Sequence, residues 1–150
     1  MASRQATVQS IAEAFNERDL DKMTAPTSDD FVYQLLPSML KYLVLKKRVK
    51  SNMIESLERG PLDVTGFREL FEATKTFFYN FQFEVVDTFE DVAANKMIMW
   101  ANVTSDTHVG KFATEAMHIF YFDEEGKIER WLEWVDSAAG KELERKMLGQ

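Results

Sequence analysis

The sequence predicts one α+β domain in which helices come first and a cone-shaped, curved antiparallel sheet follows. Apolar residues recur at helical spacing in two segments of the first half, whereas the second half alternates between apolar and polar residues over several strand-length runs. A length of 150 residues fits a single domain with one core. Because a curved sheet closed on one side by helices encloses a space, this α+β barrel is expected to hold a pocket behind its N-terminal helices.

The first elements are two helical segments and a strand. Ser3 can cap a helix whose apolar stripe begins at Val8 and ends at Phe15. A break over residues 16–19 precedes a short helical turn over 19–23. Residues 31–36 then predict a strand, which Pro37 stops.

The next periodic element is a helix that Thr65 is expected to cap, with an aromatic stripe from Phe67 to Phe81. From residue 81 the period becomes alternating, which marks the start of the sheet. Strands are expected over 81–89, 96–105, 111–122 and 127–136, and a last helix over 138–148 with Ser137 as its cap. The connection between the last two strands suits a hairpin in which Gly126 takes the left-handed conformation.

Residues 44–62 fit this pattern poorly. Residues 43–60 could form a helix, but their apolar positions keep poor register. The stretch is either an insertion that covers the mouth of a pocket or translated non-coding sequence. It overlaps a basic run, residues 41–50, which is either a solvated face or a patch for phosphate or a membrane surface.

Composition excludes several classes of function. The chain has no cysteine, which removes thiol catalysis and iron–sulfur clusters. The net charge is −7, and residues 76–150 hold 14 acidic side chains against 7 basic ones, so we expect no nucleic-acid partner. No long uncharged apolar run predicts a membrane span, and no apolar leader is visible, so a cytoplasmic location is expected.

Motifs for phosphate, dinucleotide, zinc or calcium binding are absent from the sequence. Only two histidines occur, so no metal site is expected. Polar residues nevertheless interrupt the apolar strands, namely Asn102, Glu115, His118, Arg130, Glu133 and Asp136. A carboxyl group with apolar neighbours has a raised pKa and can then both take and give a proton. Each of these residues could instead form an ordinary cross-strand pair or hydrogen bond, or, for Asp136, lie at a helix start.

The sequence does not decide which strand face lines the pocket. A three-residue loop over 124–126 pairs Asp123 with Lys127, and Glu115 and Glu133 then share one face while His118 lies on the other. A bulge shifts the pairing by one residue, and Glu133 then shares a face with His118 rather than with Glu115.

Several stretches resemble the SnoaL-like branch of the nuclear-transport-factor-2-like superfamily, in particular proteins of fungal secondary-metabolite clusters. They are residues 14–23, 36–40 and 78–85, and above all 110–137, where G-x-[FY]-x-x-E, F-D-E-x-G-K-I and E-[FW]-V-D-S occur in the family's order. The resemblance implies a cone-shaped fold, commonly dimeric, with a pocket that needs no cofactor. Such relatives include polyketide cyclases, dehydratases, meroterpenoid isomerases and a semipinacolase.

The resemblance also implies roles for residues. Glu133 falls on the glutamate of the E-[FW]-V-D-S segment and would act as acid or base, assisted by His118 or Glu115. Aromatic hydroxyls of some relatives are replaced by Phe112 and Ala116, so His118, Tyr33 or Asn102 would have to stabilise an oxyanion. Residues expected to contact a small hydrophobic substrate are Tyr33, Lys41, Trp100, Asn102, Phe112 and Trp131.

Two functions follow from this resemblance. The first is a cofactor-independent isomerase, cyclase or dehydratase that acts on a hydrophobic, polycyclic natural-product intermediate in a fungal secondary-metabolite pathway. The second is a non-catalytic module of the same fold that binds a small molecule or docks a protein. An open cavity that contains Glu133 would favour the enzyme, and a core closed by phenylalanine would favour docking.

Overall fold

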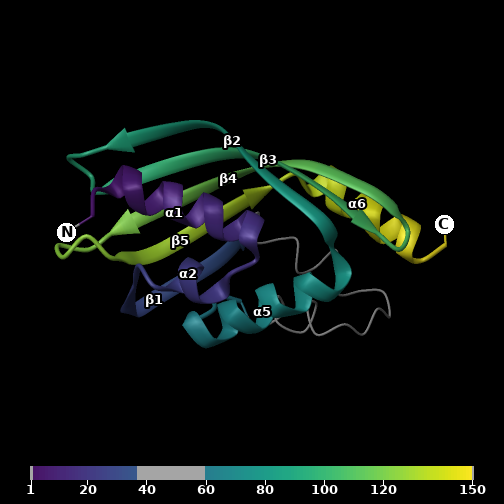
Figure 1. The fold of residues 1–150 in the computed structure, drawn as a ribbon, viewed down its shortest axis with the longest axis horizontal. Helices are drawn as coiled ribbons and strands as arrows, with labels where there is room; N and C mark the ends of the chain where they lie inside the picture. Colours follow the sequence, from purple (N-terminus) through teal and green to yellow (C-terminus); the bar gives the residue numbers. More distant parts are fainter. Residues whose placement is uncertain (1, 37–59, 150) are drawn as a thin grey trace.

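The computed structural model describes residues 2–36 and 60–149. It confirms the α+β class and the cone, formed by helices packed on a curved sheet (Figure 1). The elements are α1 (Arg4–Glu17), α2 (Leu20–Thr24), β1 (Thr27–Leu36), α5 (Val64–Phe77), β2 (Tyr79–Asp91), β3 (Lys96–Thr107), β4 (Gly110–Phe122), β5 (Ile128–Val135) and α6 (Ser137–Met147).

The sheet is mixed and open rather than wholly antiparallel. Its strand order is β1-β5-β4-β3-β2, and β1 runs parallel to β5 while the other neighbours are antiparallel. A parallel pair requires a long crossover. The chain supplies one, because β2, β3 and β4 all come between β1 and β5 in sequence. The first strand is thereby placed beside the last.

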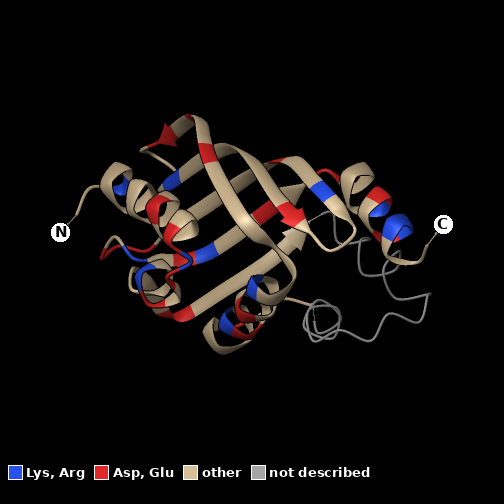
Figure 2. Cartoon of the chain, turned by 45° about the vertical axis from the view of Figure 1, so that its right-hand side comes forward, with Lys and Arg blue, Asp and Glu red and all other residues tan. Residues whose placement is uncertain are grey.

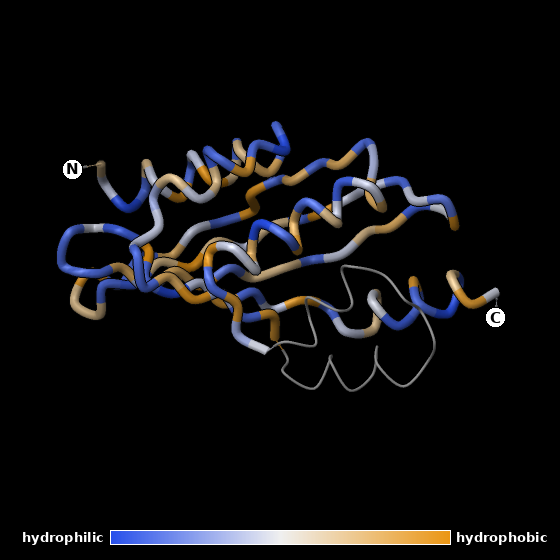
Figure 3. Tube along the Cα trace, turned by 90° about the horizontal axis from the view of Figure 1, so that it is seen from below, coloured by the Kyte–Doolittle hydropathy of each residue, from blue (hydrophilic) through white to orange (hydrophobic). Residues whose placement is uncertain are grey.

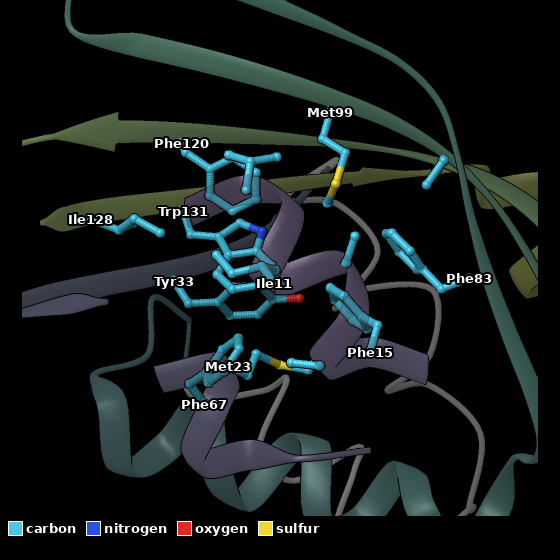
Figure 4. Close-up of a cluster of buried hydrophobic side chains, with 14 of the residues drawn as sticks. Ile11, Phe15, Met23, Tyr33, Phe67, Phe83, Met99, Phe120, Ile128 and Trp131 are labelled. Carbon is cyan, nitrogen blue, oxygen red and sulfur yellow. The ribbon is translucent and has the colours of Figure 1, made fainter. Parts of the chain in front are cut away.

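Helices α1, α2 and α5 cover the concave face of the sheet (Figure 1). Along the strands and helix α6, hydrophilic and hydrophobic residues alternate (Figure 3). The inward residues form one core, whose central side chains include Phe67 and Trp131, both at 0% exposure (Figure 4). Aromatic rings meet edge to face at its centre, as in the contact of Tyr33 with Phe67 at 5.0 Å between ring centroids.

Helix α5 ends four residues earlier than the aromatic stripe predicts. Phe78 is its extended C-cap, and the strand that follows includes Phe81. Consecutive aromatic residues favour a strand, which explains the switch. Two helix caps also differ from expectation: Asp63 rather than Thr65 caps α5, and Asp136 rather than Ser137 caps α6. In both cases a carboxylate accepts a backbone N–H at the start of the helix, where the helix dipole favours a negative charge.

The β4–β5 hairpin contains both the three-residue loop and the bulge between which the sequence does not decide. Asp123 donates its N–H to the carbonyl of Lys127 at 2.9 Å, and Gly126 has φ 79°, as the three-residue loop requires. The register then shifts by one residue, because Phe122 pairs with Ile128 but Tyr121 pairs with Arg130. Glu129 is therefore the extra residue of a β-bulge.

Lys41, the basic run over 41–50 and most of the segment 44–62 lie outside the described residues. The end of that segment belongs to the sheet, since Leu62 is buried and exchanges two backbone hydrogen bonds of 2.8 Å with Tyr33. Within residues 2–36 and 60–149, no helix has the length and apolar character to cross a membrane. Acidic and basic residues are interspersed on α5 and α6 (Figure 2).

Candidate active site

A cavity of about 270 Å³ lies between the concave face of the sheet and the helices. Its walls are almost entirely apolar, with phenylalanine side chains from α1, α5, β2, β4 and the junction between α5 and β2. These are Phe15, Phe71, Phe78, Phe81, Phe83 and Phe112. Side chains of α6 complete one end, including Leu143 and Met147. Such a lining suits an apolar ligand, and its few polar groups would fix the ligand's orientation.

Glu133 and Tyr33 are the polar pair of this cavity. Both line it, and the Tyr33 hydroxyl donates a hydrogen bond of 2.6 Å to Glu133 Oε2. The two residues reach one another because β1 and β5 are neighbours and Tyr33 pairs with Trp131, two residues before Glu133. Tyr33 is only 2% exposed, and its backbone is fixed on both edges, by β5 and by Leu62.

Burial perturbs both groups of this pair. Removal from water raises the pKa of Glu133 from its usual 4.5 to about 7, although the hydrogen bond from Tyr33 opposes this rise. Burial, followed by the charge of Glu133, raises the pKa of the Tyr33 phenol well above its usual value. At neutral pH Tyr33 is therefore a permanent hydrogen-bond donor, whereas Glu133 exists in both protonation states.

His118 lies directly opposite Glu133 on the neighbouring strand β4. It is 1% exposed, does not line the cavity, and its Nδ1 accepts a hydrogen bond of 3.0 Å from Trp131 Nε1. Because an indole N–H only donates, the proton of this imidazole is on Nε2, which has no partner in the described part of the chain. Burial lowers the pKa of His118 to about 3, so the ring is neutral.

Comparisons with known proteins identify relatives of this chain. No protein-family model matches the chain. It is 68% identical over its full length, and over the full length of the relative, to "Core atranone cluster (CAC) protein 11" of Stachybotrys chlorohalonatus. It is also 33% identical over 131 residues to "Austinoid biosynthesis clusters protein H" of Penicillium brasilianum, covering 79% of this chain and 88% of the relative.

Among solved structures, the BvnE pinacolase of Penicillium brevicompactum superposes with a TM-score of 0.79 at 17% identity. The match covers 97% of this chain and 94% of that protein. The chain belongs to the family of these fungal biosynthetic-cluster proteins, and it has the fold of NTF2-like proteins. The predicted family and its cone fold are confirmed.

The cavity brings together some of the residues expected at the site. Glu133, Tyr33 and Phe112 line it. Trp131 and His118 lie behind this lining, where Trp131 packs against Phe67 at 5.2 Å between ring centroids. The bulge at Glu129 is the reason that Glu133 and His118 share the inner face of the sheet.

Other expected residues lie on the opposite face of the sheet. Glu115, Trp100 and Asn102 all point away from the cavity, and Trp100 Nε1 donates a hydrogen bond of 3.1 Å to Glu115 Oε2. Glu115 alternates with inward-facing Thr114 and Ala116, so it cannot reach Glu133 through the sheet. Lys41 is outside the described residues.

The sequence alone did not single out two parts of the cavity. Arg18 lines the wall from the C-terminal end of α1, within the break that the sequence marks over residues 16–19. Helix α6 contributes Lys141, Glu144 and neighbouring residues at one end, and none of its residues is buried. The apolar residues of α6 recur at helical spacing and form one face of the helix. This pattern is the sequence signal that could have indicated an apolar face turned toward the pocket.

No cluster of three or more potential metal ligands occurs within the described residues. Two polar groups of the cavity can take part in a reaction: Glu133 can transfer a proton and Tyr33 can donate a hydrogen bond. Apolar walls surround both groups and reduce competition from water.

Proposed function

We propose that this SnoaL-like protein is a cofactor-independent isomerase, cyclase or dehydratase that acts by acid–base catalysis on a hydrophobic, polycyclic natural-product intermediate. One observation carries the proposal: Glu133 lines an apolar cavity with a pKa of about 7 while Tyr33 holds its Oε2 at 2.6 Å. A general acid or base works best when its pKa lies near the working pH.

Glu133 would take a proton from one position of the substrate and return it to another. Its Oε2 is held by Tyr33, so Oε1, which accepts no hydrogen bond from the described residues, is the oxygen that meets the substrate. Migration of a double bond, ring closure and loss of water all require such a transfer. The shape of the cavity would decide which of them occurs.

His118 would act as a positioning residue. It holds Trp131, whose ring packs edge to face with Tyr33 at 6.1 Å between centroids. Loss of this contact would let Tyr33, and with it Glu133, move. We do not assign Glu115 a part in the reaction, because it lies on the outer face of the sheet.

The relatives support a place in fungal secondary metabolism. The full-length relative is named as a protein of an atranone cluster, and a pinacolase has the same fold. We propose that this chain serves a biosynthetic cluster of the same kind. Its substrate would be a late, already cyclised intermediate, since the cavity is apolar and broad enough to involve residues of α1, α5, α6 and the sheet.

Deletion of the gene, followed by metabolite profiling, tests the proposal. We expect one intermediate to accumulate, and the purified protein to convert it to a product of equal mass by isomerisation or cyclisation, or to one lighter by a water by dehydration. Glu133→Gln should abolish conversion. Glu115→Gln, the matched change on the outer face, should leave it intact.

Full conversion by Glu133→Gln would overturn the acid–base assignment. If the protein instead binds the intermediate without converting it, the non-catalytic binding module is the correct function. The cavity next to Glu133 favours the enzyme over a docking domain with a closed core.

The homodimer implied by the resemblance and the cytoplasmic location both stay predictions. The outer face of the sheet carries exposed apolar side chains, among them Val32, Met117 and Trp134. We propose that a second copy covers this face. Sedimentation of the wild type and of Trp134→Glu tests this, since the charge should shift a dimer toward monomer.

A further inference from the structure

Arg18 places a cation on the wall of the cavity. It is the C-cap of α1 and adopts the left-handed conformation, with φ 56°. Its N–H bonds to the carbonyls of Ala14 and Phe15, and Asp19, the next residue, caps α2. Two helix ends therefore fix the backbone of Arg18, so its side chain has a defined starting direction.

The guanidinium of Arg18 is partly buried and incompletely bonded. Its central carbon lies 4.6 Å from the centroid of the Phe81 ring. Its Nη2 is buried and has no hydrogen-bond partner in the described part of the chain. Burial lowers the pKa of Arg18. A desolvated donor without an acceptor is unfavourable for the free protein, and that penalty disappears if a ligand supplies the acceptor.

No acidic side chain of the described residues forms an ion pair with Arg18. The charge of Glu72 acts on Arg18 and opposes the fall in its pKa, but the carboxylate of Glu72 is ion-paired with Lys75. Two further carboxylates line the cavity: Asp136 caps α6, and Glu144 forms no ion pair with Arg18. Glu133 is held by Tyr33. The positive charge of Arg18 is thus left for something that enters the cavity.

We propose that Arg18 binds a carboxylate of the ligand, so that the substrate is a polycyclic acid whose ring system fills the apolar cavity. This inference rests on the proposed function, because it concerns the same cavity. A guanidinium suits this task better than an ammonium, since its planar fork matches the two oxygens of a carboxylate. The other cations of the cavity fit less well: Lys75 is paired with Glu72, and Lys141 is exposed.

A matched pair of probes tests the proposal without knowledge of the substrate. Pyrene-1-carboxylate and its neutral counterpart pyrene-1-carboxamide have nearly the same shape, and fluorescence titration measures the binding of each. We expect wild-type protein to bind the carboxylate at least about tenfold more tightly, the lower limit for a charge-assisted hydrogen bond. Arg18→Met, which keeps an unbranched stem beside Phe81, should bind both probes alike.

Arg130→Met is the control. Arg130 also lies over an aromatic ring, that of Tyr121 at 5.2 Å, but it belongs to an exposed position of β5. Both substitutions remove one positive charge, so a general effect of net charge would appear in both. We expect Arg130→Met to keep the wild-type preference and Arg18→Lys to retain part of it.

A folded Arg18→Met protein that keeps the preference for the carboxylate would overturn the proposal. If that variant does not fold, Arg18→Gln replaces it with the same criterion. Glu133→Gln separates this proposal from the catalytic one, because it should lose turnover and keep the preference. If neither probe binds the wild type, Arg18 does not draw a polycyclic carboxylate into this cavity and the proposal fails, while the proposed function is decided separately by conversion of the accumulated intermediate.

Discussion

Glu133→Gln should stabilise the protein at alkaline pH, a result that can be measured without any substrate. The carboxyl of Glu133 has a pKa of about 7 in the folded chain and about 4.5 when unfolded. Between these values the folded state holds a proton that the unfolded state has released. The free energy of unfolding therefore falls as pH rises from about 4.5 to about 7, and it is constant with respect to this group above that range.

The size of this effect follows from the shift. A difference of about 2.5 pKa units at 1.36 kcal/mol per unit amounts to about 3 kcal/mol, which is an upper limit because the cavity leaves Glu133 partly exposed. Glutamine is neutral, has the same shape and can still accept the hydrogen bond from Tyr33. At pH 4.5 the variant and the wild type should be about equally stable. At pH 8 the variant should be more stable by about 2–3 kcal/mol.

Urea unfolding at pH 4.5, 6, 7 and 8 measures this difference. Subtracting wild type from variant cancels every group that the two proteins share, and Glu115→Gln controls for loss of a carboxylate on the sheet. A difference between Glu133→Gln and wild type that does not change with pH would refute the raised pKa, and with it the acid–base role.

Other predictions concern neighbouring groups. Tyr33→Phe removes a donor to the ionised carboxylate, so we expect it to raise the pKa of Glu133 by about one unit and to move the window of pH-dependent stability upward by the same amount; an unchanged window would contradict the role of the hydrogen bond. The effect of His118 on stability has the opposite sign, because burial lowers its pKa to about 3 in the folded chain. The unfolded chain takes up a proton at His118 as pH falls below about 6.5, and the free energy of unfolding then falls by up to about 4–5 kcal/mol. His118→Leu should therefore flatten the loss of stability in acid, as measured by urea unfolding between pH 3.5 and 6.5, and a loss equal to that of wild type would show that His118 does not titrate below its usual value. Between about pH 4.5 and 6.5 the two effects have opposite slopes, so they should largely cancel in the wild type, whereas below pH 4.5 only the effect of His118 remains.

The sequence predicts the helices and strands well where periodicity is strong and turns have clear signals. The stripe from Val8 to Phe15 and the hairpin glycine Gly126 both lie as expected. It misplaces the end of α5, because Phe78 and Phe81 continue the helical spacing by coincidence while their aromatic character favours a strand. The parallel pairing of β1 with β5 depends on long-range packing and leaves no local signal.

Knowledge of the site from sequence is limited for the same reason. Glu133 is recognisable as a carboxylate within an apolar strand, yet its partner Tyr33 is 100 residues away and becomes visible only through the strand order. The bulge does have a trace in the sequence. Glu129 and Arg130 are two successive polar residues between Ile128 and Trp131, which a strictly alternating strand would not contain.

That bulge also constrains how relatives of this chain can diverge. Loss or gain of one residue between Phe122 and Trp131 would exchange the entire set of β5 side chains that faces the cavity, so Trp134 would replace Glu133. A change of two residues would preserve the set. Lengths of this hairpin that differ by an odd number should therefore mark proteins with a different chemistry, even where the aligned residues are identical.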